Sequence, residues 1–238
     1  MDGTRTFLVG REQVAVIDPG PDVETHLRAL LSALELAQEV RVLLTHRHSD
    51  HAGAAPRLVE RTGAPLLAPA SYPIPDGFQL PVQVLKEGDR ITTDQGDLVV
   101  IEVPGHTKGH LAFHWVEAQA LFVGDLLLGK GNTTWVGEYV GCIQDYLHSL
   151  AKVEALGASV LYPGHGPAIT SPGSMVDRFR RHRLARIEEV RAARVTHPGA
   201  GVGELAEVIY GGEIPEKLAK AAESSVEATL FHLDAGMA

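Results

Sequence analysis

The sequence predicts a layered α/β fold with mixed sheets, followed by a small helical appendage. Strand-like and helix-like segments alternate in the first part of the chain, and hairpins fill its middle, which argues against a doubly wound parallel sheet. After SPGSM, at residues 171–175, all apolar repeats have helical spacing. These observations together place a layered α/β unit before a helical one.

The N-terminal part begins with a hairpin and continues with alternating helices and strands. TFLVG and QVAVIDPG read as the two strands of the hairpin. The apolar spacing over residues 22–37 marks an amphipathic helix. EVRVLLT is predicted as the next strand and AGAAPRLVERTG as a helix that ends at Gly63. The strand segments that follow are APLLAPA, PVQVLKEGD, RITTDQG, DLVVIEVPG and LAFHWVEAQALFVGD.

The last part of the chain is mostly helical in pattern. Residues 142–156 are predicted to form a helix, and ASVLYPGHG one more strand. Three further helices follow, with THPGAG and YGGEIPE as breaks between them. We therefore predict two units, residues 1–172 with the sheets and residues 173–238 as a helical extension. The three helices of the extension are predicted at 175–194, about 202–210 and 215–235.

Composition narrows the class of protein. Apolar residues make up 45% of the 238, which supports a substantial core. No apolar run approaches the ~20 residues that span a bilayer, and MDGTRTFLVG lacks a signal-peptide pattern. The lone cysteine, Cys142, excludes an internal disulfide. These features predict a cytoplasmic protein without a membrane partner, and the net charge of −9 argues against nonspecific binding to nucleic acid.

Seven side chains of metal-ligand type follow four predicted strands, each where an apolar strand gives way to a turn. The strands of stacked sheets present their ends at one rim, so the four loops can converge there. A single histidine in such a loop is more often a surface residue, but seven groups at four strand ends favour a metal centre. The seven are His46, His48, Asp50, His51, His106, Asp125 and His165.

The spacing within the first loop, LLTHRHSDHAG, suggests two ions. His46 and His48 are two apart in an extended segment, so they point the same way and can bind one ion together. Asp50 and His51 come past the bend and suit a second ion. Asp125 is the natural bridge, because a carboxylate can bind two cations and a neutral imidazole cannot. Imidazole and carboxylate ligands without thiolates favour a pair of Zn²⁺ ions, with Fe or Mn as alternatives.

In these motifs the sequence resembles the metallo-β-lactamase superfamily. THRHSDH matches the signature HxHxDH, and PGH, GD and PGH follow in the family's order at 104–106, 124–125 and 163–165. The resemblance covers about residues 3–172 and implies a four-layer αββα sandwich with the metal site at the sheet edges. It implies that one metal is bound by His46, His48 and His106, the other by Asp50, His51 and His165, with Asp125 between them and Asp18 of VIDPG supporting the ligand loops.

Within the superfamily the sequence is closest to the glyoxalase-II-like and nuclease branches, because no cysteine replaces a ligand. The tail segments HRLAR, GELAEVIYG and AAESSVEATLFHLDAG are similar to the winged-helix extension of the beta-lactamase-like protein 2 branch, which includes a mitochondrial endoribonuclease of single-stranded RNA. Residues 1–172 are thus expected to be a metallo-β-lactamase-fold catalytic domain and residues 173–238 a winged-helix-like extension. Arg5 departs from that branch, which has Asn there, and the chain stops at GMA where a wing would follow.

The predicted function is a binuclear metal-dependent hydrolase that uses a metal-bridging hydroxide on an anionic ester or thioester. Two divalent cations, less the charges of Asp50, Asp125 and a hydroxide, leave about +1, which attracts anions and stabilises an oxyanion. Metal binding lowers the pKa of water to ~7, so hydroxide is available at neutral pH. Asp50 is the predicted catalytic residue, which orients the hydroxide and moves a proton.

Two other functions stay open. The first is an endoribonuclease acting on single-stranded RNA, because residues 178–194 hold seven arginines that suit a polyanion. The short interval between Asp125 and His165 leaves no room for the inserted domain of the β-CASP branch. The second is a noncatalytic or iron-dependent redox member of the fold, which the full ligand set disfavours. A true β-lactamase is disfavoured by the expected cytoplasmic location.

Other residues near the motifs carry weaker interpretations. Lys108 is either a solvated loop charge or a substrate contact, and His110 is expected to support a ligand. Trp135 and Tyr139 either line the pocket or pack in the core, and Cys142 is expected to be a buried thiol. The expected partner is a small anionic substrate or single-stranded RNA. The oligomeric state, a homodimer included, stays open.

Overall fold

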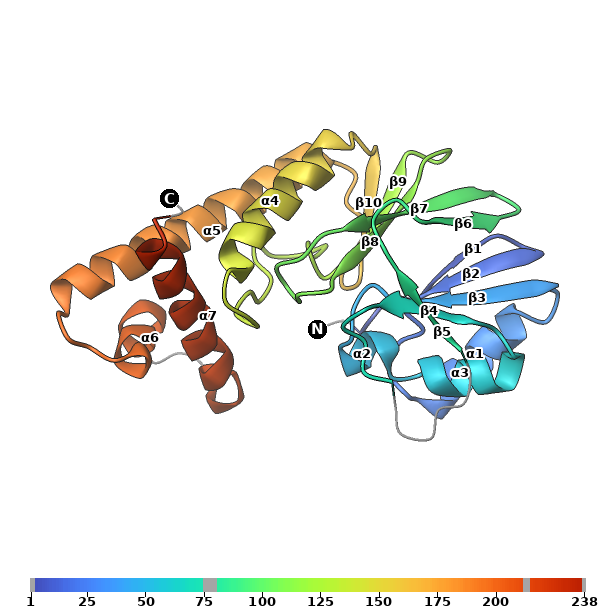
Figure 1. Ribbon diagram of the computed structural model, residues 1–238, viewed down its shortest axis with the longest axis horizontal. Helices are drawn as coiled ribbons and strands as arrows, with labels where there is room; N and C mark the ends of the chain where they lie inside the picture. The colour runs from blue at the N-terminus through green and yellow to red at the C-terminus, as the bar shows by residue number, and fades with distance from the viewer. Residues whose placement is uncertain (1–2, 75–80, 212–214, 237–238) are drawn as a thin grey trace.

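The computed structural model describes residues 3–74, 81–211 and 215–236 of the chain. Two five-stranded sheets face each other, and helices cover their outer surfaces (Figure 1). This confirms the predicted mixed α/β sandwich. Alternation along the strands explains the layers, because side chains on one face of each sheet fill the space between the sheets and those on the other face meet helices.

The first sheet has the order β1-β2-β3-β4-β5. β1 (Phe7–Val9) and β2 (Gln13–Ile17) form the predicted antiparallel hairpin. β3 (Glu39–Leu43), β4 (Leu66–Pro69) and β5 (Val82–Leu85) then add in parallel. β3 and β4 are short and hold buried Leu and Val, as expected for strands that are covered on both faces, whereas the edge strand β5 buries only Leu85.

Two helices cover the outer face of the first sheet. α1 (Glu24–Ala33) buries Leu27 and Leu30, and α3 (Ala55–Thr62) buries Leu58 and Val59. The helix predicted over AGAAPRLVERTG is α3, which starts three residues later than predicted, with a proline in its first turn, and ends at Gly63. The short helix α2 (Ser49–Ala52) precedes it. α2 carries two of the predicted ligands.

The second sheet has the order β10-β9-β8-β7-β6. β6 (Arg90–Thr93), β7 (Gly96–Glu102), β8 (Leu111–Trp115) and β9 (Ala120–Gly124) are antiparallel neighbours. β10 (Val160–Pro163) returns parallel to β9 after the crossover helix α4 (Cys142–Ala155). The core between the two sheets includes Ile17, Leu43, Leu98, Phe113 and Phe122.

Three helices follow the sandwich. α5 (Pro172–Thr196) is one continuous helix whose first half packs on α4 and the second sheet through Val176 and Phe179. Its second half packs against α6 (Val202–Tyr210) and α7 (Glu216–Asp234) through Val190 and Ala193 (Figure 1). The tail is therefore helical as predicted, while its winged-helix character and the boundary at residues 172–173 stay predictions. None of the described helices is long and apolar enough to cross a membrane.

Candidate metal centre

The four predicted ligand loops meet at one edge of the sandwich. His46 lies just beyond β3, His106 beyond β7, Asp125 directly after β9 and His165 beyond β10. All four of these side chains are almost completely buried although they are polar. Burial of unpaired polar groups is costly, so a shared partner must compensate for it.

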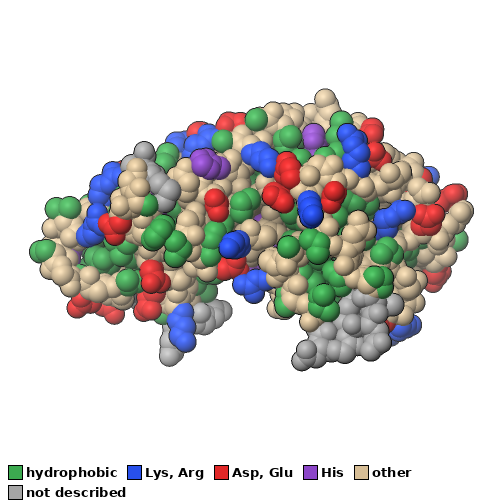
Figure 2. Space-filling view, viewed as in Figure 1, with side chains coloured by type: hydrophobic (Ala, Val, Ile, Leu, Met, Phe, Trp, Pro, Cys, Tyr) green, Lys and Arg blue, Asp and Glu red, His purple; other side chains and the backbone are tan. Residues whose placement is uncertain are grey.

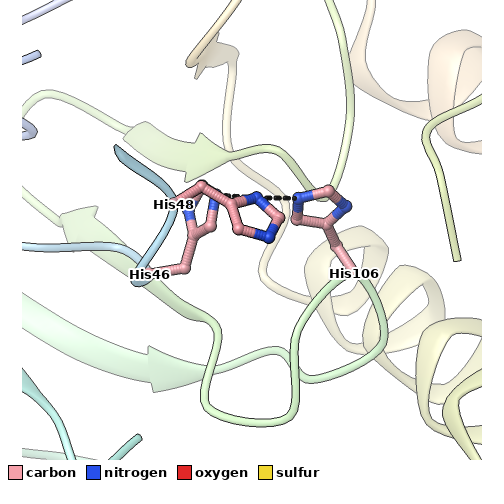
Figure 3. Close-up of side chains that lie close together, drawn as sticks. All are labelled: His46, His48 and His106. Carbon is pink, nitrogen blue, oxygen red and sulfur yellow. Dashed lines mark hydrogen bonds between the residues drawn. The ribbon is translucent and has the colours of Figure 1, made fainter. Parts of the chain in front are cut away.

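Three imidazoles make up the first group. Nδ1 of His48 lies 3.1 Å from Nε2 of His46 and 3.1 Å from Nε2 of His106, and the rings point toward one another (Figure 3). One proton on His48 could serve only one of these contacts well, whereas a cation would satisfy all three nitrogens. The separations are close to the edge of a tetrahedron with metal–nitrogen bonds of 2.0–2.1 Å, which is about 3.3 Å.

The second group combines a carboxylate with two imidazoles. Oδ2 of Asp50 lies 3.1 Å from Nε2 of His165 and 3.7 Å from Nε2 of His51. The ligand atoms of the three side chains all lie within 4.8 Å of one another. His51 is fully buried, whereas the Asp50 side chain is 47% exposed, so this group is open to solvent on the Asp50 side.

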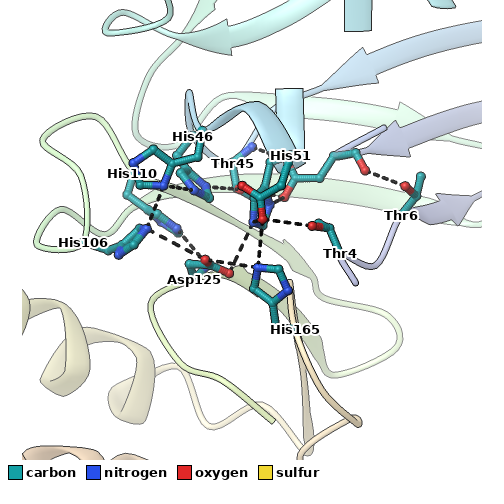
Figure 4. Close-up of polar contacts among 12 residues, drawn as sticks. Thr4, Thr6, Thr45, His46, His51, His106, His110, Asp125 and His165 are labelled. Carbon is teal, nitrogen blue, oxygen red and sulfur yellow. Dashed lines mark hydrogen bonds and ion pairs between the residues drawn. The ribbon is translucent and has the colours of Figure 1, made fainter. Parts of the chain in front are cut away.

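Asp125 lies between the two groups. Its Oδ1 is 3.4 Å from Nε2 of His51, and its Oδ2 is 3.5 Å from Nε2 of His165 and 3.8 Å from Nε2 of His106 (Figure 4). One carboxylate therefore faces ligand atoms of both groups, as the bridging position requires. Oδ1 of Asp125 and Nε2 of His51 are buried without a hydrogen-bond partner, which leaves both atoms available to a cation.

Asp18 orients ligands from both groups. Its Oδ1 accepts the backbone N–H of Thr45 at 2.8 Å, and its Oδ2 accepts the Thr45 hydroxyl at 2.7 Å and lies 2.8 Å from Nδ1 of His51. Oγ1 of Thr45 in turn lies 2.9 Å from Nδ1 of His46. The oxygens of Asp18 are thus committed to support, so Asp18 is a poor candidate for a ligand. The sequence pattern does not predict this role of Thr45.

Backbone carbonyls orient two more ligands. Nδ1 of His106 donates to the carbonyl of Trp135 at 2.8 Å, and Nδ1 of His165 donates to the carbonyl of Gly3 at 3.0 Å. A carbonyl can only accept, so each Nδ1 carries a proton, and Nε2 is the nitrogen left to face the centre. This tautomer is the one that metal ligation by Nε2 requires.

The second group attracts positive charge. Burial opposes protonation of His51, but the carboxylates of Asp18 and Asp125 raise its pKa to about 10. Hydrogen bonds to Asp125 and Asp50 raise the pKa of His165 to about 10. The His165 contact also lowers the pKa of Asp50 to about 2, so this carboxylate is ionised at neutral pH. The carboxylates therefore stabilise cationic charge where a metal would lie.

The first group stays neutral, as ligation requires. Burial lowers the pKa of His46 well below its ordinary value, and burial also lowers the pKa of His48 and His106. Neutral imidazoles with converging lone pairs beside an ionised carboxylate suit a divalent cation. The residues present therefore fit a pair of metal ions.

Comparison with known protein families also points to a metal-binding fold of this kind. Residues 2–165 match the family model described as the Metallo-beta-lactamase superfamily. The chain belongs to the metallo-β-lactamase superfamily.

Two relatives of this superfamily member bear on its activity. A protein of Caenorhabditis elegans named Beta-lactamase-like protein 2 homolog is 30% identical to this chain. The match covers 80% of this chain and 65% of the length of that protein. An Aspergillus chevalieri protein named Atrochrysone carboxyl ACP thioesterase is 32% identical to this chain, and the match covers 93% of this chain and 72% of the length of that protein. Membership in the superfamily and these names support a hydrolase.

The fold, tail helices included, also occurs in a solved superfamily structure. The crystal structure of a metallo-beta-lactamase family protein from Thermus thermophilus, TTHA1429, matches 99% of this chain and 89% of that chain. The TM-score is 0.81 at 24% sequence identity. The tail of this superfamily member is therefore part of a recurring arrangement.

Most of the other residues singled out near the ligand motifs contact neighbouring side chains or backbone and are not ligands themselves. His110 is buried, stacks on His46 with ring centroids 4.9 Å apart and accepts the N–H of Asp125 at 3.1 Å through Nε2. Lys108 is exposed, and its backbone N–H donates to Glu138. Tyr139 donates to Asp145 at 2.7 Å. Cys142 is buried in the core beside the second sheet.

The arginines of α5 are largely paired with acids. Arg180 contacts Glu154, Arg181 contacts Asp177, and Arg186 contacts Glu189. Nearer the end of the helix, Arg191 contacts Glu188 and Arg194 contacts Asp234. Basic and acidic side chains are accordingly interspersed on the face seen in Figure 2. Arg183 differs, because it is 3% exposed and turned inward.

Proposed function

We propose that this chain is a binuclear metal-dependent hydrolase of an anionic ester or thioester. The observation that carries the proposal is the position of Asp125 between two groups of three ligand atoms, His46–His48–His106 and Asp50–His51–His165. When bound there, two divalent cations would make a water acidic enough to ionise near neutral pH and would stabilise negative charge on a carbonyl oxygen. Zn²⁺ is the metal that the donor set favours, with Fe or Mn as alternatives.

Asp50 is the proposed catalytic residue. Its Oδ2 accepts the Thr4 hydroxyl at 3.0 Å and lies 3.1 Å from His165, while its side chain stays half exposed. Other carboxylates of the centre are buried, so Asp50 is the acid that an incoming substrate and water can reach. Asp50 can orient the attacking water, accept its proton and pass that proton to the leaving oxygen or sulfur.

Esters and thioesters are favoured over RNA for two reasons. The Aspergillus chevalieri relative is named as a thioesterase. The tail arginines, which would have to meet a polyanion, mostly pair with carboxylates of this chain, so little unpaired basic charge remains on that helix. A small anionic substrate is the proposed partner.

Metal analysis followed by parallel assays tests the proposal. We expect two metal ions per chain and hydrolysis of S-D-lactoylglutathione or an aryl ester, with little cleavage of a phosphodiester or a single-stranded RNA oligomer. The variant His106→Ala should lose both metal and activity, whereas His114→Ala, outside the centre on β8, should keep both. Cleavage of RNA without ester hydrolysis, or full activity after exhaustive chelation, would overturn the proposal.

A further inference from the structure

A largely apolar cavity of about 480 Å³ opens beside the candidate metal centre. The ligands His106 and Asp125 line it. Trp135 also lines it, with its ring 6.0 Å from that of His106 and its Nε1 donating to the carbonyl of Ala221 at 2.9 Å. The other walls come from the tail, with Arg183 on α5, Tyr210 at the end of α6 and Leu218 on α7. A volume in this range suits a small organic molecule, and a molecule lying here would touch the centre and the tail at once.

Arg183 is a buried cation in this wall. It is 3% exposed, its Nη2 donates to the carbonyl of Thr134 at 3.1 Å, and its guanidinium lies 5.5 Å from the centre of the Tyr146 ring. Its Nε has no hydrogen-bond partner, and no described carboxylate forms an ion pair with it. Burial lowers the pKa of Arg183, yet a guanidinium remains protonated at any pH near neutrality.

The neighbouring arginine in the cavity wall is already neutralised. Nη1 of Arg186 lies 2.7 Å from Glu189, and its guanidinium stacks 4.4 Å from the centre of the Tyr210 ring. Among the described residues that line the cavity, Arg183 is therefore the arginine without a counter-charge. The cavity carries about one unbalanced positive charge in its tail wall.

The helix pattern makes this position unusual. The buried residues of α5 recur with helical spacing, and Arg183 occupies a place in that stripe between Phe179 and Ile187. An unpaired charge in such a stripe costs free energy unless something satisfies it. If position 183 had only a structural role, an apolar side chain could fill it at a lower cost in free energy.

We propose that Arg183 binds the carboxylate of the substrate, a carboxylate-bearing ester or thioester whose apolar body fills the cavity and whose scissile carbonyl lies at the metal centre. This inference rests on the proposed function and deepens it by naming the substrate class. Arg183 is a specificity residue in this proposal, because it lines the cavity and belongs to neither group of ligands. The carboxylate it binds is separate from the ester group.

The charge and shape of the wall favour a carboxylate. A guanidinium offers two parallel N–H groups that match the two oxygens of a carboxylate, and one unbalanced cation suits a monoanion. A phosphate monoester carries nearly two charges, and an RNA strand would bring several phosphates toward a wall that is mostly apolar. The apolar lining instead suits an aliphatic or aromatic body.

Binding of a matched pair of probes tests the proposal without relying on turnover. We would measure 2-naphthoate and its neutral isostere 2-naphthamide by calorimetry on the metal-loaded protein. We expect the carboxylate to bind about 10- to 100-fold tighter than the amide, and Arg183→Gln to remove that preference while changing amide affinity by less than about twofold. Gln removes the charge and keeps an amide N–H donor in the same wall. Arg183→Lys should retain part of the preference.

Arg181→Gln is the matched control, because Arg181 lies on the same helix but pairs with Asp177 on the exposed side. It should leave both affinities unchanged. Three outcomes would overturn the proposal: no preference in the unsubstituted protein, a preference that survives Arg183→Gln and so belongs to the metal centre, or equal weakening of both probes, which indicates a purely structural role.

A kinetic comparison separates this inference from the proposed function. The kcat/KM ratio of p-nitrophenyl hydrogen glutarate to p-nitrophenyl valerate should fall about 10-fold or more in Arg183→Gln, with the loss mainly in KM for the carboxylate. A ratio that does not change would contradict the role of Arg183 while leaving ester hydrolysis intact. Absence of hydrolysis of either ester would contradict the proposed function, and the calorimetric result would still decide the role of Arg183.

Discussion

Asp18 is the residue on which both ligand groups depend. It accepts hydrogen bonds from Thr45 and lies 2.8 Å from Nδ1 of His51, and through Thr45 it also fixes His46. Because its charge also makes the His51 site attractive to cations, its effect is both geometric and electrostatic. A change at Asp18 should therefore affect metal binding more than the fold.

Asp18→Asn should weaken metal binding about 10- to 100-fold. The amide removes the negative charge. Its NH2 group is a donor and would replace a carboxylate oxygen that now accepts a hydrogen bond. Metal titration against a competing chelator measures the effect. The control is Asp22→Asn, since Asp22 is exposed and contacts Arg57 away from the centre. Equal affinities for Asp18→Asn and Asp22→Asn would rule out the supporting role.

Asp50→Asn should reduce hydrolysis at least about 100-fold even at saturating metal, because an amide cannot accept the proton of the attacking water. Thr4→Val removes only the hydroxyl that donates to Asp50, so a much smaller loss is expected. Turnover and metal content would be measured on the same samples. Full activity of a fully loaded Asp50→Asn variant would exclude the catalytic role.

At the scale of elements, the ends of the strands place the ligands and glycines allow the loops to approach closely. Gly164 follows β10, and its N–H donates to the carbonyl of Gly124, the last residue of β9, at 2.8 Å. A Cβ on Gly164 would lie 2.4 Å from Cε1 of His51 and 2.7 Å from Oδ1 of Asp125. The loops of two sheets can thus meet here only without a side chain.

Gly164→Ala should destabilise the protein by about 1–3 kcal/mol and displace ligands of the centre. Thermal unfolding and metal content would both be measured, and both should fall. Gly173→Ala is the control: nothing lies within 4 Å of its added Cβ, and Ala is favoured in the first turn of α5. If Gly164→Ala bound metal as well as Gly173→Ala, the close approach would not matter for the centre.

The sequence predicted the strand-end ligands because each motif directly follows an apolar strand, so local order fixed its place. It did not predict the carbonyls of Trp135 and Gly3, since every residue has a carbonyl and only the folded chain brings these two to His106 and His165. Arg183 belongs to the run of seven arginines that the sequence predicts as suited to a polyanion, but the fold buries it. The apolar stripe of α5 carries the signal that would have shown it facing inward.

At the scale of the whole molecule, the centre joins the two sheets. Its ligands come from loops after β3, β7, β9 and β10, which belong to different sheets. Bound ions would therefore link parts of the chain that are distant in sequence. Their binding free energy adds to the stability of the folded state.

Removing metal should lower the unfolding midpoint on the order of 10 °C. Each site filled at 100 times its dissociation constant stabilises the fold by about 2.7 kcal/mol, and in a chain of this size each kcal/mol moves the midpoint by about 2–4 °C. Calorimetry with and without a chelator measures the shift, and added Zn²⁺ should restore the midpoint. Superimposable curves would mean that the loops do not hold metal.

The continuity of α5 has an evolutionary consequence. One rigid rod contributes Phe179 to the core of the sandwich, Arg183 to the cavity and Val190 to the core of the tail. A lineage that altered the tail to accept another molecule would have to keep the first half of this rod matched to the second sheet. Diversification among relatives with this arrangement should accordingly concentrate in α6 and α7, while the opening half of α5 changes only together with its partners on α4.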